Sequence, residues 1–344
     1  MKQYDYLFVT HLPAFYKVNL YNQIAKHAKV YVIFIASGSA IRTADFTNQN
    51  YAFDYCVINP LSFEQRNKLT SCLKTVWAAS RISYRYLVVG GWDLIEYWLL
   101  ILLSAKRKNC LALESSIFES NLKGYRGFVK KQFLRKIALA FPSGQAHVAL
   151  LQKLKYRGDA KKTLGVGIMN YQPRESIGKN FSGQFLYVGR FAPEKNLFVL
   201  LEAFRALPQY RLTLIGGGPL KAALLKYKSD NVTLLDHVPN DQLVAAYKAH
   251  DVFILPSTKE PWGLVVEEAL YYGLPVIVSD KVGSGPDLVL NHQGRIFPYN
   301  NVQALINAVI SIEKDYAKLC QSIAAFDLKN KDNHQVQQYL EALV

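Results

Sequence analysis

Beyond residue 183, short apolar runs alternate with helix-like stretches. Segments such as LFVLLEAFRAL, LVAAYKAH and LVVEEALYY, which are typical of helices, separate strand-like runs at 185–189, 212–216, 232–236, 252–256 and 275–279. Strands that are apolar throughout and separated by helices are typical of a parallel sheet covered on both faces. We therefore predict an α/β domain with a doubly wound sheet in this half.

The first half repeats this alternation less clearly, with YLFVT, KVYVIFI, YLVVGG and CLALES as candidate strands. A chain of 344 residues exceeds one typical core. The polar stretch NYQPRESIGKNFSG (170–183), with proline and glycines, indicates the boundary. We predict two doubly wound, Rossmann-like domains facing each other across a cleft. Their ranges are 1–178 and 179–328, with 329–344 returning to the first domain.

Charge is distributed unevenly between these halves. Residues 1–179 contain 26 Lys and Arg against 10 Asp and Glu, a net charge of +16, whereas residues 180–344 contain 15 against 16, a net charge of −1. This asymmetry indicates an anionic partner for the first half alone, either nucleic acid or an acidic membrane surface.

Hydropathy and cysteine content bear on localisation. The longest apolar run, WLLILLSA (98–105), is shorter than the roughly 20 residues that cross a bilayer. We expect neither a membrane-spanning segment nor export. The four cysteines have no C-x-x-C spacing, which favours reduced thiols in a cytoplasmic setting over zinc binding or disulfides.

Polar residues and glycines follow the strands of the second half, where doubly wound sheets bind their ligands. Arg190, the glycines 216–218, Glu260 and Asp280 each lie just after a strand-like run. Arg190 and Lys195, in GRFAPEKN, are close enough in sequence to converge on a diphosphate. The alternative is a solvated loop with two ordinary surface cations.

The stretch KEPWGLVVEEALYYGLP (259–275) places one glutamate before a helix and another inside it. Gly263 allows close approach of the backbone, and a helix starting near Leu264 directs free N–H groups at phosphate oxygens. Glu260 is then positioned for sugar hydroxyls and Glu268 for the two hydroxyls of a ribose. Glutamates on this helix can also be solvated charges, and we expect this of Glu267.

Four motifs in this order and spacing carry a resemblance to a known family. VGRFAPEKN, LTLIGGGP, LVAAYKAHDVFILPS and KEPWGLVVEEALYYGLPVIVSD resemble the donor domain of retaining glycosyltransferases with a GT-B fold, family 4, also called glycosyl transferases group 1. The resemblance covers roughly residues 184–300. Arg-x4-Lys followed by Glu-x7-Glu is a specific signal for this family when both motifs occur together. Either motif alone is a weak signal.

The resemblance implies a role for each matching residue. Arg190 and Lys195 would hold the diphosphate and support the leaving nucleotide, while Glu260 would contact the donor sugar. Glu268 would bind the ribose. The remaining donor-binding positions implied are Gly189, Gly216, the backbone of Gly263, Leu264 and Val265, and His237 with Val238 near the base.

The reaction implied by the resemblance fits these residues. Breaking a sugar–phosphate bond places negative charge on the diphosphate, which fixed cations and a helix N-terminus stabilise. The chain has no Asp-x-Asp pair and no clustered His, Asp and Glu set. We therefore expect neither a metal nor another cofactor, with the nucleotide sugar as co-substrate.

The first half resembles the family poorly. Its first strand-to-helix loop, THLPAFYKVN, lacks the glycines that family members often have there. Lys17 is a candidate for supplying positive charge instead, or is a surface lysine. Glu114, at the end of the strand-like run CLALES, is a candidate at the interface of acceptor and donor, with Glu119 or neither as alternatives. His11 ends the first strand and either faces the cleft or is a packed polar residue.

Residues 121–141 interleave six cations with aromatic and aliphatic side chains. At helical spacing, Phe133, Ile137 and Phe141 share one face, the composition of a helix on an anionic membrane surface. A helix packed on its own domain has the same composition. We favour the membrane over RNA, and expect no nucleic acid, because no recognition module with aromatic platforms is visible.

Together these features predict a glycosyltransferase that moves a sugar from a nucleotide-sugar donor to a cell-surface glycan or its lipid-linked precursor, with retention of configuration. The expected context is polysaccharide or lipopolysaccharide biosynthesis by a cytoplasmic protein peripheral to the inner face of the cell membrane. A nucleotide-sugar epimerase of the same architecture and a non-catalytic nucleotide-sugar-binding scaffold are the alternatives.

Overall fold

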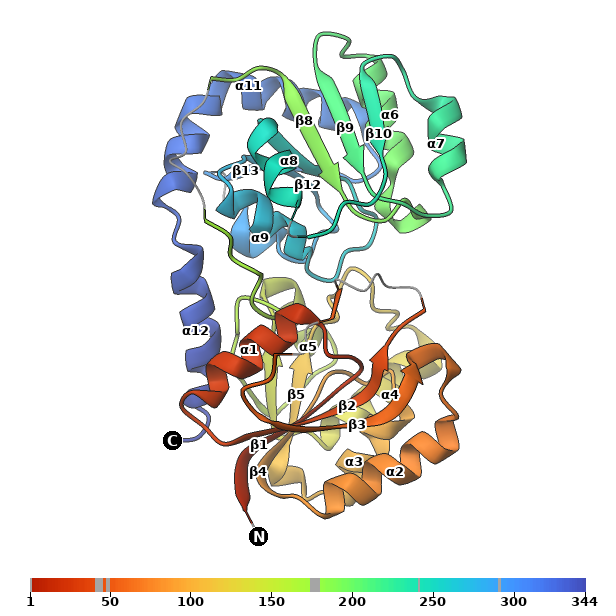
Figure 1. Ribbon diagram of the computed structural model, residues 1–344, viewed down its shortest axis with the longest axis vertical. Helices are drawn as coiled ribbons and strands as arrows, with labels where there is room; N and C mark the ends of the chain where they lie inside the picture. The colour runs from red at the N-terminus through yellow and green to blue at the C-terminus, as the bar shows by residue number, and fades with distance from the viewer. Residues whose placement is uncertain (1, 41–45, 48–49, 174–179, 241, 290–291) are drawn as a thin grey trace. The chain divides into compact units, whose positions relative to one another are not determined.

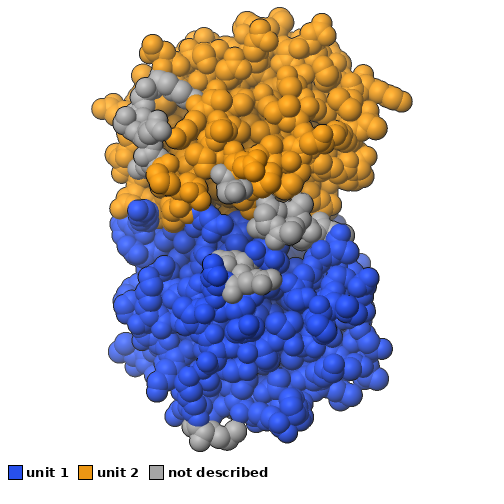
Figure 2. Space-filling view, in the orientation of Figure 1, with its two compact units in different colours: residues 1–170, 329–344 blue, residues 171–328 orange. Residues whose placement is uncertain are grey.

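A computed structural model describes residues 2–40, 46–47, 50–173, 180–240, 242–289 and 292–344. The chain forms two compact units, Met1–Asn170 with Lys329–Val344 and Tyr171–Leu328 (Figures 1 and 2). The boundary predicted between residues 178 and 179 lies outside the described residues. The segment 329–344 belongs to the first unit.

The first unit contains a seven-stranded parallel sheet with the order β3-β2-β1-β4-β5-β6-β7. Its strands are β1 (Gln3–Thr10), β2 (Val30–Gly38), β3 (Asp54–Ser62), β4 (Ser83–Val89), β5 (Asn109–Leu113), β6 (Leu139–Pro142) and β7 (Asp159–Ala160). The four predicted strands correspond to β1, β2, β4 and β5. Prediction missed β3 because DYCVINPLS mixes polar residues and a proline, and it missed β6 because LAFP was assigned to a helix.

Alternate residues of β1 face two helical layers. Leu7 and Val9 belong to a core cluster shared with α2 (Lys68–Ser80), α3 (Ile95–Leu103), α4 (Gly124–Arg135) and α5 (Gln145–Lys153). Phe8, on the other face, stacks on Tyr21 of α1 (Phe15–Ala25) with ring centroids 4.4 Å apart. Short 3₁₀ helices, η2 (Phe63–Gln65) and η3 (Lys106–Lys108), complete this part of the unit.

Helix α12 (Leu328–Leu340) packs on the first sheet beside α1 (Figure 1). The Tyr339 ring is buried and stacks on Phe141 of β6, with centroids 4.2 Å apart. The Tyr6 hydroxyl donates to the backbone oxygen of Tyr339 at 2.5 Å, and Gln335 Nε2 donates to the Gly165 oxygen at 2.9 Å. The core of the first unit therefore includes a segment that follows the second unit in sequence.

The second unit contains a six-stranded parallel sheet with the order β10-β9-β8-β11-β12-β13. Its strands are β8 (Gln184–Val188), β9 (Arg211–Ile215), β10 (Val232–Leu235), β11 (Val252–Leu255), β12 (Val276–Ser279) and β13 (Gly294–Phe297). Its helices are η4 (Pro193–Lys195), α6 (Leu197–Arg205), α7 (Lys221–Tyr227), α8 (Leu243–Ala249), α9 (Leu264–Tyr271), α10 (Gly285–Leu288) and α11 (Val302–Ala325). The five predicted strands are β8 to β12, and the predicted fold class of two doubly wound α/β domains is confirmed.

Strand order reverses at one point in each sheet. The chain runs outward from β1 through β2 to β3, then returns to place β4 on the other side of β1, and β8 and β11 repeat the arrangement. Doubly wound sheets bind ligands at the carboxyl ends of the strands at this switch point. The residues after β8 and β11, and those after β1 and β4, are therefore the first places to look for function.

Residues 121–141 do not form one interfacial helix. Helix α4 ends at Arg135, and Phe141 lies in β6. Phe133, Ile137 and Phe141 are all buried in the first unit, so the predicted apolar membrane face is wrong. The exposed aromatic side chains of this segment are instead Tyr125 and Phe128, which are 79% and 57% exposed.

In the described part of the chain, no helix is both long enough and apolar enough to span a bilayer. The four cysteines are free thiols; Cys72 and Cys110 are buried, and Cys56 and Cys320 are partly buried.

Candidate functional site

The switch point of the second unit joins two loops that are distant in sequence. Lys195, in η4 after β8, forms an ion pair through Nζ with Oε2 of Glu260, in the loop after β11. The Ser257 hydroxyl donates to the same carboxylate oxygen at 3.2 Å. The side chains of Lys195 and Glu260 are 19% and 13% exposed. The structure thus joins two predicted site residues in one partly buried pair.

Arg190 follows β8 and has an exposed side chain. Its backbone oxygen accepts a hydrogen bond from the buried Tyr187 hydroxyl at 2.9 Å. The Arg190 guanidinium forms no ion pair with any residue that the structure describes. It is therefore available to an anionic ligand, while its backbone is fixed.

The glycines after β8 and β9 pack directly against each other. A Cβ on Gly216, which has a φ of 150°, would lie 2.0 Å from the backbone oxygen of Gly189. Phe191 N donates to the Gly217 oxygen at 2.7 Å, which joins the two loops. Glycine at position 216 is therefore required by loop packing, a reason that does not depend on a ligand.

Helix α9 begins at Leu264, as predicted, and Gly263 is its N-cap residue with a φ of 90°. This left-handed conformation favours glycine, and a Cβ here would lie 3.2 Å from Cγ of Glu260. Leu264 and Val265 are half-buried at the first turn. The free N–H groups of a first helical turn form an anion site, and this one lies beside the Lys195–Glu260 pair.

Glu268 lies one turn into α9 and is half-buried. The Tyr247 hydroxyl donates to its Oε2 at 2.9 Å. Burial raises the pKa of Glu268 to about 7; the hydrogen bond from Tyr247 opposes this shift, and the charge of Glu267 adds to it. Glu268 therefore changes its charge near neutral pH.

The expectation that Glu267 is a solvated helix charge is wrong. Its side chain is fully buried, and Trp262 Nε1 donates to its Oε1 at 2.6 Å. A buried indole N–H needs an acceptor. Trp262, just before the glycine that starts α9, is the only sequence signal for this contact.

His237 and Val238 follow β10, the outermost strand of the sheet on that side. His237 is exposed and Val238 is half-buried. Both lie beyond the carboxyl end of a strand that is separated from β8 by β9. They lie on the same edge of the sheet as Arg190, and their contact with the base stays a prediction.

A polar cluster lies at the switch point of the first unit. His11, after β1, contacts Oδ2 of Asp93 through Nε2 at 2.8 Å. The Tyr97 hydroxyl lies 3.1 Å from the other ring nitrogen. His11 therefore has polar partners on both nitrogens. Sequence reasoning missed Asp93 and Tyr97, although Asp93 shortly follows the predicted strand YLVVGG.

Lys17 and Glu114 form an ion pair in the first unit, with Nζ 2.7 Å from Oε1. The ammonium also donates to the Thr10 hydroxyl at 3.1 Å. Burial alone would lower the pKa of Lys17, but the Glu114 carboxylate outweighs it and holds that pKa well above the usual value. Lys17 is thus a buried cation and not a surface lysine. Glu119, the alternative to Glu114, instead accepts from Ser116 N at 3.1 Å.

The chain is similar in sequence to a known protein family and to curated glycosyltransferases. Residues 174–326 match the family model of glycosyl transferases group 1. The chain is 38% identical over 121 residues to sulfoquinovosyl transferase SQD2 of Arabidopsis thaliana, over 35% of this chain and 24% of the relative. It is 31% identical over 146 residues to O-antigen chain mannosyltransferase B of Escherichia coli, over 39% of this chain and 38% of the relative. The chain thus spans well under half the length of these curated relatives.

A solved structure shares the whole fold. Anabaena Alr3699/HepE in complex with UDP and glucose superposes with a TM-score of 0.74 over 98% of this chain and 100% of that chain, at 17% identity. The fold of this chain is therefore GT-B, and the match over residues 174–326 supports a glycosyltransferase of group 1.

Proposed function

We propose that this chain transfers a sugar from a nucleotide-sugar donor to a cell-surface glycan or its lipid-linked precursor, with retention of anomeric configuration, as in family 4. The observation that carries this proposal is the Lys195–Glu260 pair at the switch point between β8 and β11. Arg190, which forms no ion pair with the described residues, and the first turn of α9 belong to the same edge of the sheet.

The positive groups bind and stabilise the diphosphate. When the sugar–phosphate bond breaks, negative charge develops on the leaving nucleotide, and donors fixed in advance stabilise it without reorganising. Glu260, whose carboxylate is itself held by the Ser257 hydroxyl, holds the Lys195 ammonium in place before any ligand arrives. Arg190 and the N–H groups of α9 add positive charge. These groups supply what a metal would otherwise provide, so we propose transfer without a metal ion or other cofactor.

The two glutamates divide the donor between them. Both side-chain contacts to the Glu260 carboxylate fall on Oε2, which leaves Oε1 for a hydroxyl of the transferred sugar. Glu268 keeps one acceptor oxygen beyond the one that Tyr247 uses, and we assign it to the ribose. His237 and Val238 contact the base, and the backbone of Gly263, Leu264 and Val265 contacts the phosphates and sugar.

The first unit supplies the acceptor side. His11, held by Asp93 and Tyr97, is our candidate for contact with the acceptor hydroxyl. The Lys17–Glu114 pair joins the first turn of α1 to the segment after β5. Removing His11 should therefore slow transfer to the acceptor more than it weakens binding of the donor.

The acceptor proposal includes a peripheral contact with the inner face of the membrane. The exposed rings of Tyr125 and Phe128 on α4 replace the buried stripe as the apolar contact. Lys123, Arg126 and Lys131 are exposed around them. Each such cation near an anionic leaflet contributes about 1 kcal/mol. Binding to acidic vesicles should weaken with salt, and Tyr125→Ser with Phe128→Ser should reduce it further.

One experiment tests the transfer itself. A panel of nucleotide sugars is screened for thermal stabilisation, since a ligand that binds only the folded state raises its stability. The stabilising donor is then incubated with lipid-linked glycan acceptors, and the linkage of the product is determined by NMR. A glycosylated product with the donor's anomeric configuration supports the proposal. A donor that binds but is neither transferred, hydrolysed nor epimerised identifies a non-catalytic binder.

A further inference from the structure

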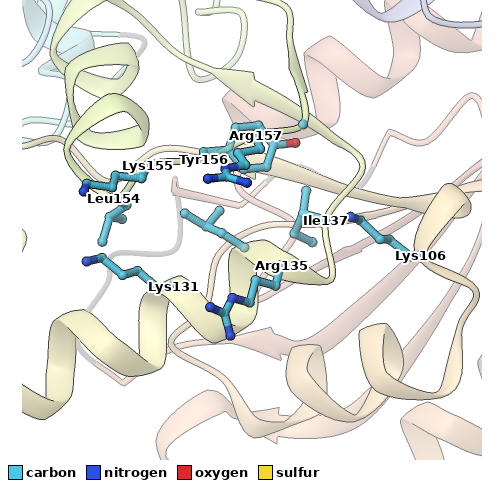
Figure 3. A pocket seen from close by; sticks show the side chains of 10 residues that line it. Lys106, Lys131, Arg135, Ile137, Leu154, Lys155, Tyr156 and Arg157 are labelled. Atoms are coloured by element: carbon cyan, nitrogen blue, oxygen red, sulfur yellow. The ribbon is translucent and has the colours of Figure 1, made fainter.

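The first unit contains a second basic site, built from segments that are not at its switch point. A pocket of about 470 Å³ is lined by α4, by the turn after α5 and by η3 (Figure 3). Its cationic side chains are Lys106, Lys131, Arg135, Lys155 and Arg157.

The charge of this pocket is uncompensated. No acidic side chain is among the residues that line it. None of its five cations forms an ion pair with a residue in the described part of the chain. Among the described residues, their side-chain hydrogen bonding is limited to a neutral contact from Arg135 Nη1 to Gln132 Oε1 at 3.0 Å. Like charges around one cavity repel, so an anion bound there relieves the repulsion.

The floor of the pocket is apolar. Leu134, Ile137 and Leu154 line it and are buried. Figure 3 shows Lys131 and Arg135 on one side, Tyr156 and Arg157 on the opposite side, and Ile137 between Arg157 and Lys106. Cationic side chains around an apolar floor are complementary to a ligand that has both an anionic group and an apolar moiety.

The backbone at Lys155, which follows the end of α5, adopts an unusual conformation. Helix α5 ends with hydrogen bonds from Lys155 N to the Gln152 oxygen and from Tyr156 N to the Leu151 oxygen, the Schellman arrangement. The residue in the left-handed position of this motif is usually glycine, yet here it is Lys155, with a φ of 55°. The fold thus accepts local strain at the position that places an ammonium on the pocket.

We propose that this pocket binds a phosphate group, as a diphosphate or as a phosphate ester with an apolar body. Guanidinium groups bind phosphate oxygens in pairs, and ammonium groups act as point charges beside them. The volume lies within the range of small-molecule sites. The site is independent of the donor site, because all of its residues belong to the first unit.

Chemical modification of lysine locates the binding. Full-length protein is acetylated with and without pyrophosphate, and peptide mass spectrometry follows Lys106 and Lys155. At a pyrophosphate concentration about ten times Kd, a bound ligand should slow acetylation of both by about tenfold. Lys153, exposed on α5 but outside the pocket lining, is the control. Equal rates with and without pyrophosphate, or equal protection of Lys153, would overturn the proposal.

Variants separate binding from folding. Lys155→Gly removes one cation and restores the residue that the left-handed position favours, so it should weaken pyrophosphate binding without lowering the unfolding midpoint. Together with Arg157→Gln it should weaken protection of Lys106 by about tenfold. Arg107→Gln, which removes a neighbouring cation that does not line the pocket, and Arg190→Ala, in the other unit, should leave protection unchanged. If protection of Lys106 is lost only in Arg190→Ala, the ligand is at the donor site and the pocket is not a site.

The source of the phosphate is resolved by a second comparison. Phosphatidylcholine vesicles containing phosphatidic acid are compared with pyrophosphate at equal phosphate concentration. Stronger protection by the vesicles identifies a lipid headgroup, and stronger protection by pyrophosphate identifies a soluble phosphate. One result would refute the pocket. If vesicles still protect Lys106 from acetylation in the double variant Lys155→Gly with Arg157→Gln, and pyrophosphate gives no protection, the vesicles bind a diffuse basic surface.

Discussion

Glu268 makes nucleotide affinity depend on pH, if its carboxylate accepts the ribose hydroxyls as proposed. Its pKa is raised to about 7 by burial, so near neutrality about half of the molecules carry a protonated Glu268. A protonated carboxyl accepts fewer hydrogen bonds from two hydroxyls than an ionised one does. With UDP as the probe nucleoside diphosphate, binding should therefore tighten as pH rises from 6 to 8.

The magnitude follows from the ionised fraction. With a pKa of about 7, about a tenth of the carboxyls are ionised at pH 6 and about nine-tenths at pH 8. If only the ionised form binds the ribose, Kd for UDP falls by about tenfold over that interval. Near pH 7, binding should release about half a proton from Glu268.

Calorimetry of UDP binding at pH 6, 7 and 8, in two buffers with different ionisation enthalpies, measures both quantities. UDP itself titrates near this range, so Glu268→Gln is the reference, because the ligand's own protons contribute equally to both proteins. Tyr247→Phe removes the hydrogen bond that lowers the pKa and should move the transition to higher pH. The same pH dependence in wild type and Glu268→Gln would refute the ribose assignment.

Stability should respond in the opposite direction. The folded pKa of Glu268 lies above its unfolded value of 4.5, so the folded state holds the proton more tightly. The resulting contribution to stability is fully present below pH 4.5 and is lost as pH rises to about 7. At about 1.4 kcal/mol per pKa unit the loss is on the order of 3 kcal/mol. Glu268→Gln should be more stable than wild type at pH 8, and urea unfolding at pH 5 and pH 8 measures this difference.

Four further substitutions test the site. Arg190→Ala and Lys195→Ala should each lower turnover by about 100-fold with the fold intact, because both cations act on charge that grows in the transition state; wild-type turnover in steady-state assays would exclude this role. Glu260→Ala should impair transfer but spare calorimetric binding of UDP, and a loss of UDP binding would contradict the sugar assignment. Glu267→Ala removes the carboxylate that accepts from the buried Trp262 N–H and should cost about 1–3 kcal/mol in urea unfolding; unchanged stability would show that this hydrogen bond does not stabilise the fold.

Sequence patterns predicted the second unit better than the first for a physical reason. The strands β8 to β12 are almost continuously apolar, so each stood out as a separate run. Strand β3 is polar on much of its surface, and β6 is too short to show a period. The basic segment 121–141 contains both helix α4 and the start of strand β6. Because the prediction treated it as one helix, it placed Phe141 on a helical face, whereas Phe141 lies in the strand.

The candidate site residues of the second unit were also predicted better from the sequence than those of the first unit. The rule that polar residues gather at strand ends brought Lys195 and Glu260 into one site across 65 positions of sequence. It identified His11 but not the partners Asp93 and Tyr97, because the sequence does not show that β4 lies next to β1. The burial of Glu267 was missed because its acceptor role depends on the orientation of one indole ring.

Helix α12 sets an order for folding during synthesis. Domains usually fold as they emerge from the ribosome, N-terminal domain first. Here Tyr339 covers Phe141 and contacts Tyr6, so the first sheet keeps an uncovered aromatic face until the helix has been translated. The second unit can close its core before that moment. Until then the nascent first unit exposes apolar surface of the kind that chaperones bind.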